Sequence, residues 1–426
     1  MAARRSVNPA VGWAFQADDA AVLRALAQGE RRRALSQYFG KPAHAELSDL
    51  ARAAAAAKRR PGPPVIILPG IMGSTLGVSS GNRGAAPRVW WIDPNRIAAG
   101  GLVDLALPAG RRLRPLGVLL HGYARLKLQL QVDGFDARLH AYDWRLGIDE
   151  IGRALATRIL AGRRPVMLVG HSMGGMIARI AMHYLPKRHV RKLVMLGTPN
   201  HGSFAPILAL RGTYPFVRKV ATLDRRHSAE QLAQSVFRTF AGLYQLLPPA
   251  RRTKGIDLFD PAGWPERGPS PDPQLLLRAA AVRRELAPPD ARMTHIIGVN
   301  RDTIVGVHCA GHEFVYTVGL NGDGTVPVDL AHMPAVKTYY VDEAHGNLAS
   351  NPLVVAAASE LLRRGRTNLL ARTWRRSAEP PKQIADTQLG CLDGRKVDWH
   401  ALDAAERANF LIGLNEAAPA EPAAGE

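Results

Sequence analysis

Cysteine is scarce in this chain of 426 residues, which has only Cys309 and Cys391. Two cysteines cannot build the disulfide framework of a small secreted protein. Neither belongs to a Cys-x-x-Cys pair of the kind that holds zinc or carries out redox chemistry. The sequence predicts neither a metal site nor a cofactor.

Long apolar runs are missing as well. No stretch approaches the roughly eighteen consecutive apolar residues that cross a bilayer. The segment after Arg4 and Arg5 is polar and does not form the apolar core of a signal peptide. We expect a protein that is made in the cytoplasm and either stays there or binds a membrane peripherally, with a leaderless secretion route left open.

Acidic residues are too few to balance the basic ones. The chain has 56 Lys and Arg against 36 Asp and Glu, and its net charge is +20. Such a charge suits nucleic acid or an anionic membrane surface. The excess is mostly scattered arginine, and no zinc-finger spacing, RNP-like run or heptad-linked basic region appears. We expect no nucleic-acid partner and keep an anionic membrane surface as a possible one; the sequence leaves the oligomeric state open.

The chain does contain a Gly-x-Ser-x-Gly signature, which lies in the run VMLVGHSMGG at residues 166–175. A short apolar segment leads into it and a helix-like segment follows. A serine hydroxyl becomes a nucleophile when a sharp turn lifts it from the chain beside a base and free backbone amides. Gly170 and Gly174 have no side chains to block so tight a bend. We identify Ser172 as the candidate nucleophile.

Strand-like and helix-like runs alternate from residue 65 onwards. The expected strands are 65–70, 137–144, 166–170, 193–196, 294–300, 313–320 and 336–341, and the expected helices are 116–132, 148–160, 173–184 and 352–362. This alternation predicts parallel strands joined by crossover helices, with ligands at the carboxyl ends of the strands.

Three regions follow from composition. Residues 1–60 read as a helical N-terminal extension that ends at the Pro- and Gly-rich break 61–64. Residues 61–365 form the α/β domain. Residues 366–426 form a C-terminal extension, with one helix expected over 399–414 and a disordered tail.

A long insertion at about residues 203–292 interrupts the alternation and is the natural cap over a site. A Ser228-x-x-Gln231 capping box predicts a helix start, and the prolines at 248–249 predict its end. One apolar stripe runs along this helix: Leu232, Val236, Phe237, Phe240, Leu243, Tyr244 and Leu247. The stripe packs on the core, lines an acyl-chain groove, or does both; Phe237, Phe240 and Tyr244 are the candidate substrate contacts.

A serine nucleophile needs a histidine base, and the histidine needs a carboxylate to fix its tautomer. Asp323 lies in a glycine-bracketed turn after one expected strand, and His345 lies in the loop after the next. The order Ser172, Asp323, His345 is that of an α/β-hydrolase. We predict this triad and, with it, an α/β-hydrolase fold: a mostly parallel sheet with helices on both faces and a helical cap.

The oxyanion of a tetrahedral intermediate needs preorganised backbone amides. Met173, directly after the nucleophile, is expected to supply one. The loop after the first strand is expected to supply the other, from Met72 or alternatively Ile71. His171 is predicted to pack under the serine turn without a catalytic role.

Seven motifs in this order resemble the lecithin:cholesterol acyltransferase family: VIILPGIMGSTL at 65–76, the tryptophan pair at 90–91, YDWR at 142–145, GHSMGG at 170–175, LYQLLP at 243–248, GDGTVP at 322–327 and HGNL at 345–348. The resemblance implies the same triad and oxyanion residues. It also implies that Trp90 and Trp91 belong to a lid or membrane-touching loop, and that residues 142–145 support the site. The run LGTPNHGS at 196–203 is closer to bacterial lipases and esterases, which favours hydrolysis over acyl transfer.

The expected activity is hydrolysis of acyl-ester lipids, as a lipase or a phospholipase of the A type, through an acyl-enzyme on Ser172. Two alternatives remain open. One is an acyltransferase that passes the same acyl group to a lipid alcohol. The other is a non-catalytic module that presents its basic arms to a membrane or a partner.

Overall fold

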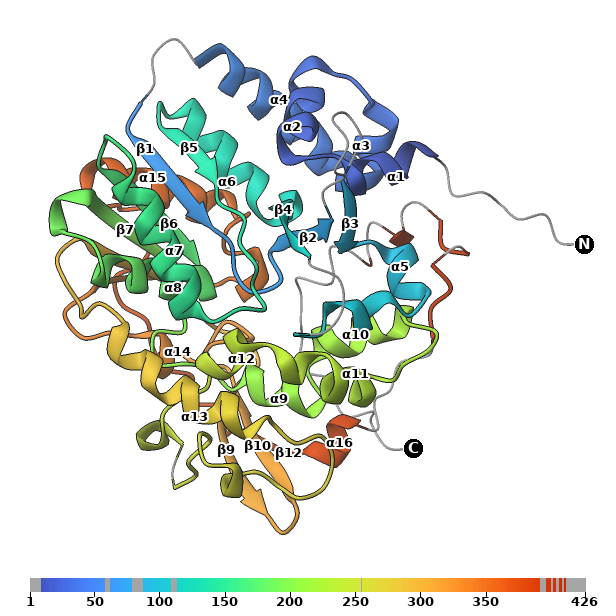
Figure 1. The fold of residues 1–426 in the computed structure, drawn as a ribbon. Helices are drawn as coiled ribbons and strands as arrows, with labels where there is room; N and C mark the ends of the chain where they lie inside the picture. The colour runs from blue at the N-terminus through green and yellow to red at the C-terminus, as the bar shows by residue number, and fades with distance from the viewer. Residues whose placement is uncertain are drawn as a thin grey trace, which may run out of the picture.

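A six-stranded parallel sheet forms the centre of the protein (Figure 1). The computed structural model describes residues 9–57, 62–78, 87–108, 113–253, 255–390, 396–399, 401–403, 406–407 and 410. The strand order is β11-β8-β7-β6-β1-β5, with bounds β1 (Pro64–Leu68), β5 (Asp136–Leu139), β6 (Val166–His171), β7 (Val190–Leu196), β8 (Met293–Gly298) and β11 (Lys337–Val341).

Helices cover both faces of this sheet. One face carries α6 (Leu120–Val132) and α15 (Pro352–Arg364), and the other carries α7 (Ile148–Leu160) and α8 (Met173–His183). The central strand β6 is buried along its whole length. Its side chains alternate between the two cores, with Leu168 packed on the α7 and α8 side and Val169 on the α6 and α15 side. A strand that is buried on both faces of a sheet needs an almost continuous run of apolar residues.

Two small antiparallel sheets flank the central one. The first has the order β3-β2-β4, and the second β12-β10-β9. Their bounds are β2 (Ser74–Val78), β3 (Arg88–Trp91), β4 (Arg114–Val118), β9 (Thr303–Ala310), β10 (Glu313–Gly319) and β12 (Lys382–Ala385).

The observed strands correct three sequence predictions. Residues 116–118 form the end of β4 and not the start of a helix. The strand expected over 137–144 ends at Leu139, and residues 140–144 form a loop. The strand expected over 313–320 belongs to the second small sheet and not to the parallel one. Alternation in sequence reports that a segment is a strand, but it does not report which sheet the strand joins.

The N-terminal region folds into four helices: α1 (Pro9–Gln16), α2 (Asp19–Gln28), α3 (Arg32–Phe39) and α4 (Lys41–Ala57). Their apolar residues form one cluster with Leu120, Ala124 and Leu128 of α6. The N-terminal helices therefore share a core with the α/β domain. Residues 58–61 lie outside the described residues, so only residues 62–64 of the expected break at 61–64 are described.

The cap consists of short helices: α9 (Ala205–Arg211), α10 (Pro215–Leu223), α11 (Ala229–Ser235), the 3-10 turn η3 (Phe237–Thr239), α12 (Ala241–Gln245) and α13 (Pro273–Val282). The capping box at Ser228 and Gln231 is present as predicted. The single helix expected up to residue 247 is wrong, because Val236 and Phe240 leave helical geometry. Each short piece turns its own apolar residues inward, so the whole stripe is buried.

The C-terminal segment returns to the cap side of the molecule. Strand β12 pairs with β10, and Asp386 forms a buried ion pair with Arg211 at 2.6 Å. The sequence did not predict this strand, because strand-like and helix-like runs no longer alternate in this part of the chain. Only residues 399, 401–403, 406–407 and 410 of the expected 399–414 helix are described, and the tail 411–426 lies outside the described residues.

The remaining short elements are α5 (Pro94–Ala98), α14 (Val328–Ala331), α16 (Asp386–Gly390) and the 3-10 turns η1 (Gly101–Leu105), η2 (Lys187–His189), η4 (Ala250–Arg252), η5 (Pro261–Gly263), η6 (Arg283–Glu285) and η7 (His345–Asn347). Within the described part of the chain, no helix has the length and apolar character to cross a membrane.

Candidate active site

Ser172 sits on a sharp turn between β6 and α8, at the carboxyl edge of the central sheet. Its backbone adopts φ 53° and ψ −126°, a conformation that a residue with a side chain rarely takes. Gly170 and Gly174 make the turn possible. A Cβ on Gly170 would collide with Gly175, and one on Gly174 would collide with the carbonyl of Leu68. The glycine spacing thus has the steric reason that the sequence motif predicts.

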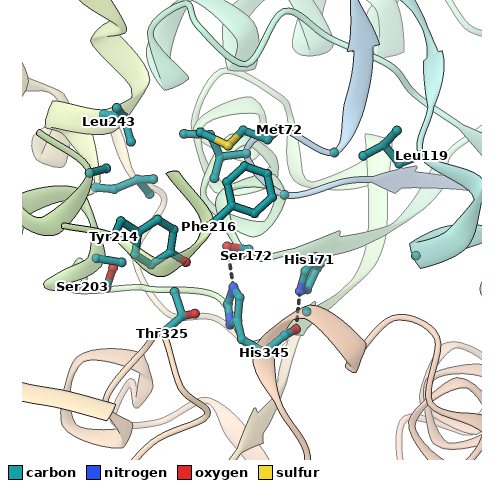
Figure 2. A pocket seen from close by; sticks show the side chains of 18 of the residues that line it. Met72, Leu119, His171, Ser172, Ser203, Tyr214, Phe216, Leu243, Thr325 and His345 are labelled. Carbon is teal, nitrogen blue, oxygen red and sulfur yellow. Dashed lines mark hydrogen bonds between the residues drawn. The ribbon is translucent and has the colours of Figure 1, made fainter. Parts of the chain in front are cut away.

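Ser172, His345 and Asp323 form one hydrogen-bonded chain (Figure 2 shows the first link). The Ser172 hydroxyl donates to Nε2 of His345 at 2.9 Å, and Nδ1 of His345 donates to Oδ2 of Asp323 at 2.7 Å. Both distances suit hydrogen bonds. The structure therefore brings together the three residues that were named from the sequence.

A tight turn fixes the carboxylate of Asp323. Its Oδ1 accepts hydrogen bonds from the amides of Thr325 at 3.0 Å and Val326 at 2.7 Å, which leaves Oδ2 for His345. The backbone amide of His345 also donates to the carbonyl of Asp323 at 2.8 Å. Asp323 follows β10 of the small sheet, so the expected route along a central strand is wrong, although the residue reaches the expected place.

His171 and Tyr123 form a second hydrogen-bond network below the serine. The Tyr123 hydroxyl accepts from the amide of Gly70 at 2.8 Å, so its own hydrogen points to Nδ1 of His171, 2.7 Å away. Nε2 of His171 then donates to the carbonyl of His345 at 2.9 Å. Burial, followed by the proximity of His345, lowers the pKa of His171 to about 3. His171 is therefore a neutral spacer with a fixed tautomer.

The sequence did not predict this network. His171 was expected only to pack under the turn, and Tyr123 was an unremarked residue of a helix. The position of His171 next to the serine was the one available signal. Tyr123 could not be found without knowing how α6 is rotated against β1.

The two expected oxyanion amides belong to the loop after β1 and to the start of α8. Met72 follows β1, has φ 61° and lines the same cavity as Ser172. Its carbonyl accepts a hydrogen bond from Nε1 of Trp91 at 2.8 Å, which holds the loop. Met173 is the first residue of α8, and amides in the first turn of a helix have no partner within the helix. Met72 thus lies beside Ser172 in the cavity wall, and Met173 follows Ser172 directly in the chain.

Ser172 opens into a cavity that connects with solvent. In Figure 2, Leu119 lies on one side of the serine, and Tyr214 and Ser203 lie on the other. The apolar side chains around the cavity include Ile71, Met72, Trp91, Leu119, Ala209, Phe216, Leu243 and Leu246. Ser172 and His345 therefore lie in the wall of the same cavity as these apolar side chains.

The candidate lid and substrate-contact residues are buried in this structure. Trp90 is 4% exposed and Trp91 is 0% exposed, so neither forms a membrane-touching surface in this structure. Trp91 lines the cavity instead. Phe237, Phe240 and Tyr244 are buried in the cap core and do not line the cavity; Leu243, from the same stripe, does.

Residues 142–145 hold the loop that follows β1. The Tyr142 hydroxyl donates to the carbonyl of Pro69, and Nε1 of Trp144 donates to the carbonyl of Ser74 at 3.0 Å. Arg145 is buried and pairs with Asp143 at 2.6 Å. These contacts support the backbone around Met72. Among the described residues, no group of three or more His, Cys, Asp or Glu side chains is arranged to hold a metal ion.

Comparison with known proteins gives one family match. The model of a PGAP1-like alpha/beta domain matches residues 148–237, a span that contains Ser172 but neither Asp323 nor His345. No curated protein matches the chain.

Two solved structures are similar at low identity. The Bacillus licheniformis lipase BlEst2 in mature form has 16% identity and a TM-score of 0.38, over 71% of this chain and 94% of that chain. A chain of the Tle4–Tli4 complex has 14% identity and a TM-score of 0.45, over 70% and 97%. The predicted fold class is confirmed by the architecture of this chain itself: a parallel central sheet in the order β11-β8-β7-β6-β1-β5 with helices on both faces, which is an α/β-hydrolase fold.

Proposed function

We propose that this chain is a serine hydrolase that cleaves acyl esters of lipids. One observation carries the proposal: Ser172, His345 and Asp323 form a continuous hydrogen-bonded chain at the mouth of an apolar cavity. Oxygen, imidazole and carboxylate in this order are the parts of an activated nucleophile. The cavity supplies what a fatty acyl chain needs, which is apolar surface away from water.

The proposed reaction has two halves. His345 takes the proton from the Ser172 hydroxyl through Nε2 while Oγ attacks the ester carbonyl carbon. Asp323 stabilises the imidazolium, and the amides of Met72 and Met173 stabilise the oxyanion. His345 then gives its proton to the leaving alcohol. In the second half, His345 deprotonates a water molecule, which attacks the acyl carbon. The bond from that carbon to Ser172 Oγ then breaks, His345 returns the proton to Oγ, and the fatty acid leaves.

Because the sequence resembles the lecithin:cholesterol acyltransferase family, acyl transfer is the alternative to hydrolysis in this proposal. Both reactions share the acyl-enzyme and differ in whether water or a lipid alcohol attacks it. A phospholipid labelled in its acyl chain, incubated with and without diacylglycerol or a sterol, separates them. We expect free fatty acid to be the main product with and without the acceptor, and dominant acyl transfer would contradict hydrolysis.

We also propose that the positive charge helps the protein bind anionic lipid surfaces. The net charge is +20, and attraction of this kind weakens as salt screens it. Sedimentation with phosphatidylserine-containing liposomes should fall as salt rises. Binding that does not change with salt would count against a role for the charge.

A further inference from the structure

The cavity at Ser172 extends to the N-terminal helices. Phe15 of α1 and Tyr38 of α3 line it, together with His121 and Gly122 of α6. The motifs that resemble known acyltransferases begin only at residue 65. One wall of the cavity is therefore built by a segment that lies outside those motifs.

This wall consists of three rings in contact with one another. Phe15 meets Tyr38 edge to face, with ring centroids 5.1 Å apart, and the rings of Tyr38 and His121 are 4.1 Å apart. Nε2 of His121 donates to the backbone carbonyl of Tyr38 at 2.6 Å. Edge-to-face contacts at these distances are favourable and directional. The three side chains therefore form one packed surface.

Contacts on other segments hold the wall in place. Gln16 accepts a hydrogen bond from the amide of Val89 and donates to Asp93, both at 3.0 Å. Asp19 accepts from the amide of Val118 at 2.9 Å. These contacts tie α1 and α2 to the small sheet beside the active site. Phe15 itself packs against both the main core and the core of the N-terminal helices.

The wall suits a hydrocarbon chain. Burial lowers the pKa of His121, so this imidazole is neutral, and its Nε2 already has a partner. Leu119 adds to the apolar lining of the same cavity. The acyl part of a lipid ester is a plain hydrocarbon, whereas the alcohol part carries polar groups that need hydrogen bonds or water. This end of the cavity matches the acyl part.

Gly122 leaves room for a chain on the same side. It lies on α6 and lines the cavity, and a Cβ placed on it would meet no atom within 4 Å. Larger side chains at this position can therefore fill the space without colliding at their first carbon.

We infer that the N-terminal helices close the end of the acyl-binding cavity, and that Phe15 with Tyr38 sets the longest acyl chain that fits. This inference rests on the proposed ester hydrolysis. It assigns to the N-terminal region a role in substrate selection that is separate from the reaction at Ser172.

The test measures kcat/KM for p-nitrophenyl esters from acetate to palmitate. Phe15→Ala should move the preference to longer chains, by about fourfold for each methylene that newly fits. Gly122→Leu should move it to shorter chains. Trp13→Ala is the matched control, because Trp13 is an aromatic residue of the same helix that packs with the N-terminal core and does not line the cavity. It should leave the profile unchanged.

Three outcomes overturn the inference. The first is that Phe15→Ala and Gly122→Leu leave the profile as in wild type. The second is that Trp13→Ala shifts it as much as Phe15→Ala, because the effect would then be general loosening. The third is that the shifts appear with acetate esters of alcohols of increasing length instead of the acyl series. If wild type hydrolyses no ester, the proposed function fails instead.

Discussion

His171, the residue immediately before the nucleophile, donates from Nε2 to the backbone carbonyl of His345, 2.9 Å away. The serine turn and the loop that carries the base are thus joined by a bond that is independent of the triad itself. The same imidazole accepts from the Tyr123 hydroxyl, which also accepts from the amide of Gly70. Three loops that converge on Ser172 are therefore connected through one neutral histidine.

Buried neutral histidines should make the protein less stable in acid. Burial, as the main cause, lowers the pKa of both His171 and His295 to about 3. Between this value and about 6.5, the unfolded chain binds protons that the folded chain does not. The stabilisation is fully present above pH about 6.5 and is lost as the pH falls toward about 3, by about 1.4 kcal/mol per pKa unit for each group. Thermal unfolding followed by circular dichroism across this range measures it.

The control for this prediction is a pair of substitutions. His171→Gln should reduce the slope of stability against pH, because it removes one of the groups that titrates only on unfolding. His308→Gln should leave the slope unchanged, because His308 is exposed. Equal slopes in wild type and His171→Gln would contradict the account of a neutral, buried His171.

Removal of one hydroxyl should show what the network below the serine contributes. Tyr123→Phe leaves the amide of Gly70 and Nδ1 of His171 buried without this partner. An unpaired buried polar group costs about 1–3 kcal/mol, so chemical denaturation should report a loss of this size and kcat should fall. Tyr184→Phe removes a hydroxyl that bonds Glu285 at the surface and should change stability by less than about 0.5 kcal/mol. A neutral Tyr123→Phe would show that the network is dispensable.

Substitution of alanine for two helical glycines should change the free energy of unfolding in opposite directions. At Gly122 of α6, a Cβ meets open space, and alanine should stabilise the protein by about 0.5–1 kcal/mol through helix propensity. At Gly152 of α7, a Cβ would collide with Ile180, and overpacking should cost about 1–3 kcal/mol. Denaturant midpoints of the two variants test this; the same sign in both would be inconsistent with the packing described.

Asp323→Asn should disable the base while it keeps the fold. The Asn carbonyl can still accept from the amides of Thr325 and Val326, but the amide group cannot orient and stabilise the protonated His345. We expect kcat to fall by roughly 10³- to 10⁴-fold. A matched change is Asp342→Asn, at an exposed carboxylate that pairs with Arg301, which should keep wild-type activity. Activity retained in Asp323→Asn would remove this residue from the proposed triad.

The sequence was sufficient for the fold class and for the three residues that meet at the serine. The Gly-x-Ser-x-Gly turn is a local steric motif, and the order of strands and loops constrains where Asp323 and His345 can end. The sequence was not sufficient where the position of a side chain depends on packing against distant segments. The cap stripe reads as one helix, but Val236 and Phe240 break it because burial of every apolar residue outweighs helix propensity.

The N-terminal cavity wall could not be found by pattern either. Phe15 and Tyr38 are ordinary positions of short helices, and nothing local marks them as facing the cavity of Ser172, a residue that lies more than a hundred positions later in the chain. Likewise, β12 pairs with β10, which lies far from it in the sequence, and no alternation of strand-like and helix-like runs predicts this pairing. Such long-range placements follow from the whole core and not from the segment alone.

Substitution of the nucleophile tests the central proposal most directly. Wild type and Ser172→Ala are compared for hydrolysis of a panel of lipid esters and for labelling by a fluorophosphonate probe. We predict that wild type hydrolyses at least one acyl-ester lipid and is labelled, and that Ser172→Ala is unlabelled and loses about 10³-fold or more of the activity. An unlabelled wild type, or equal labelling and activity in the two proteins, would contradict the proposal and favour a non-catalytic module.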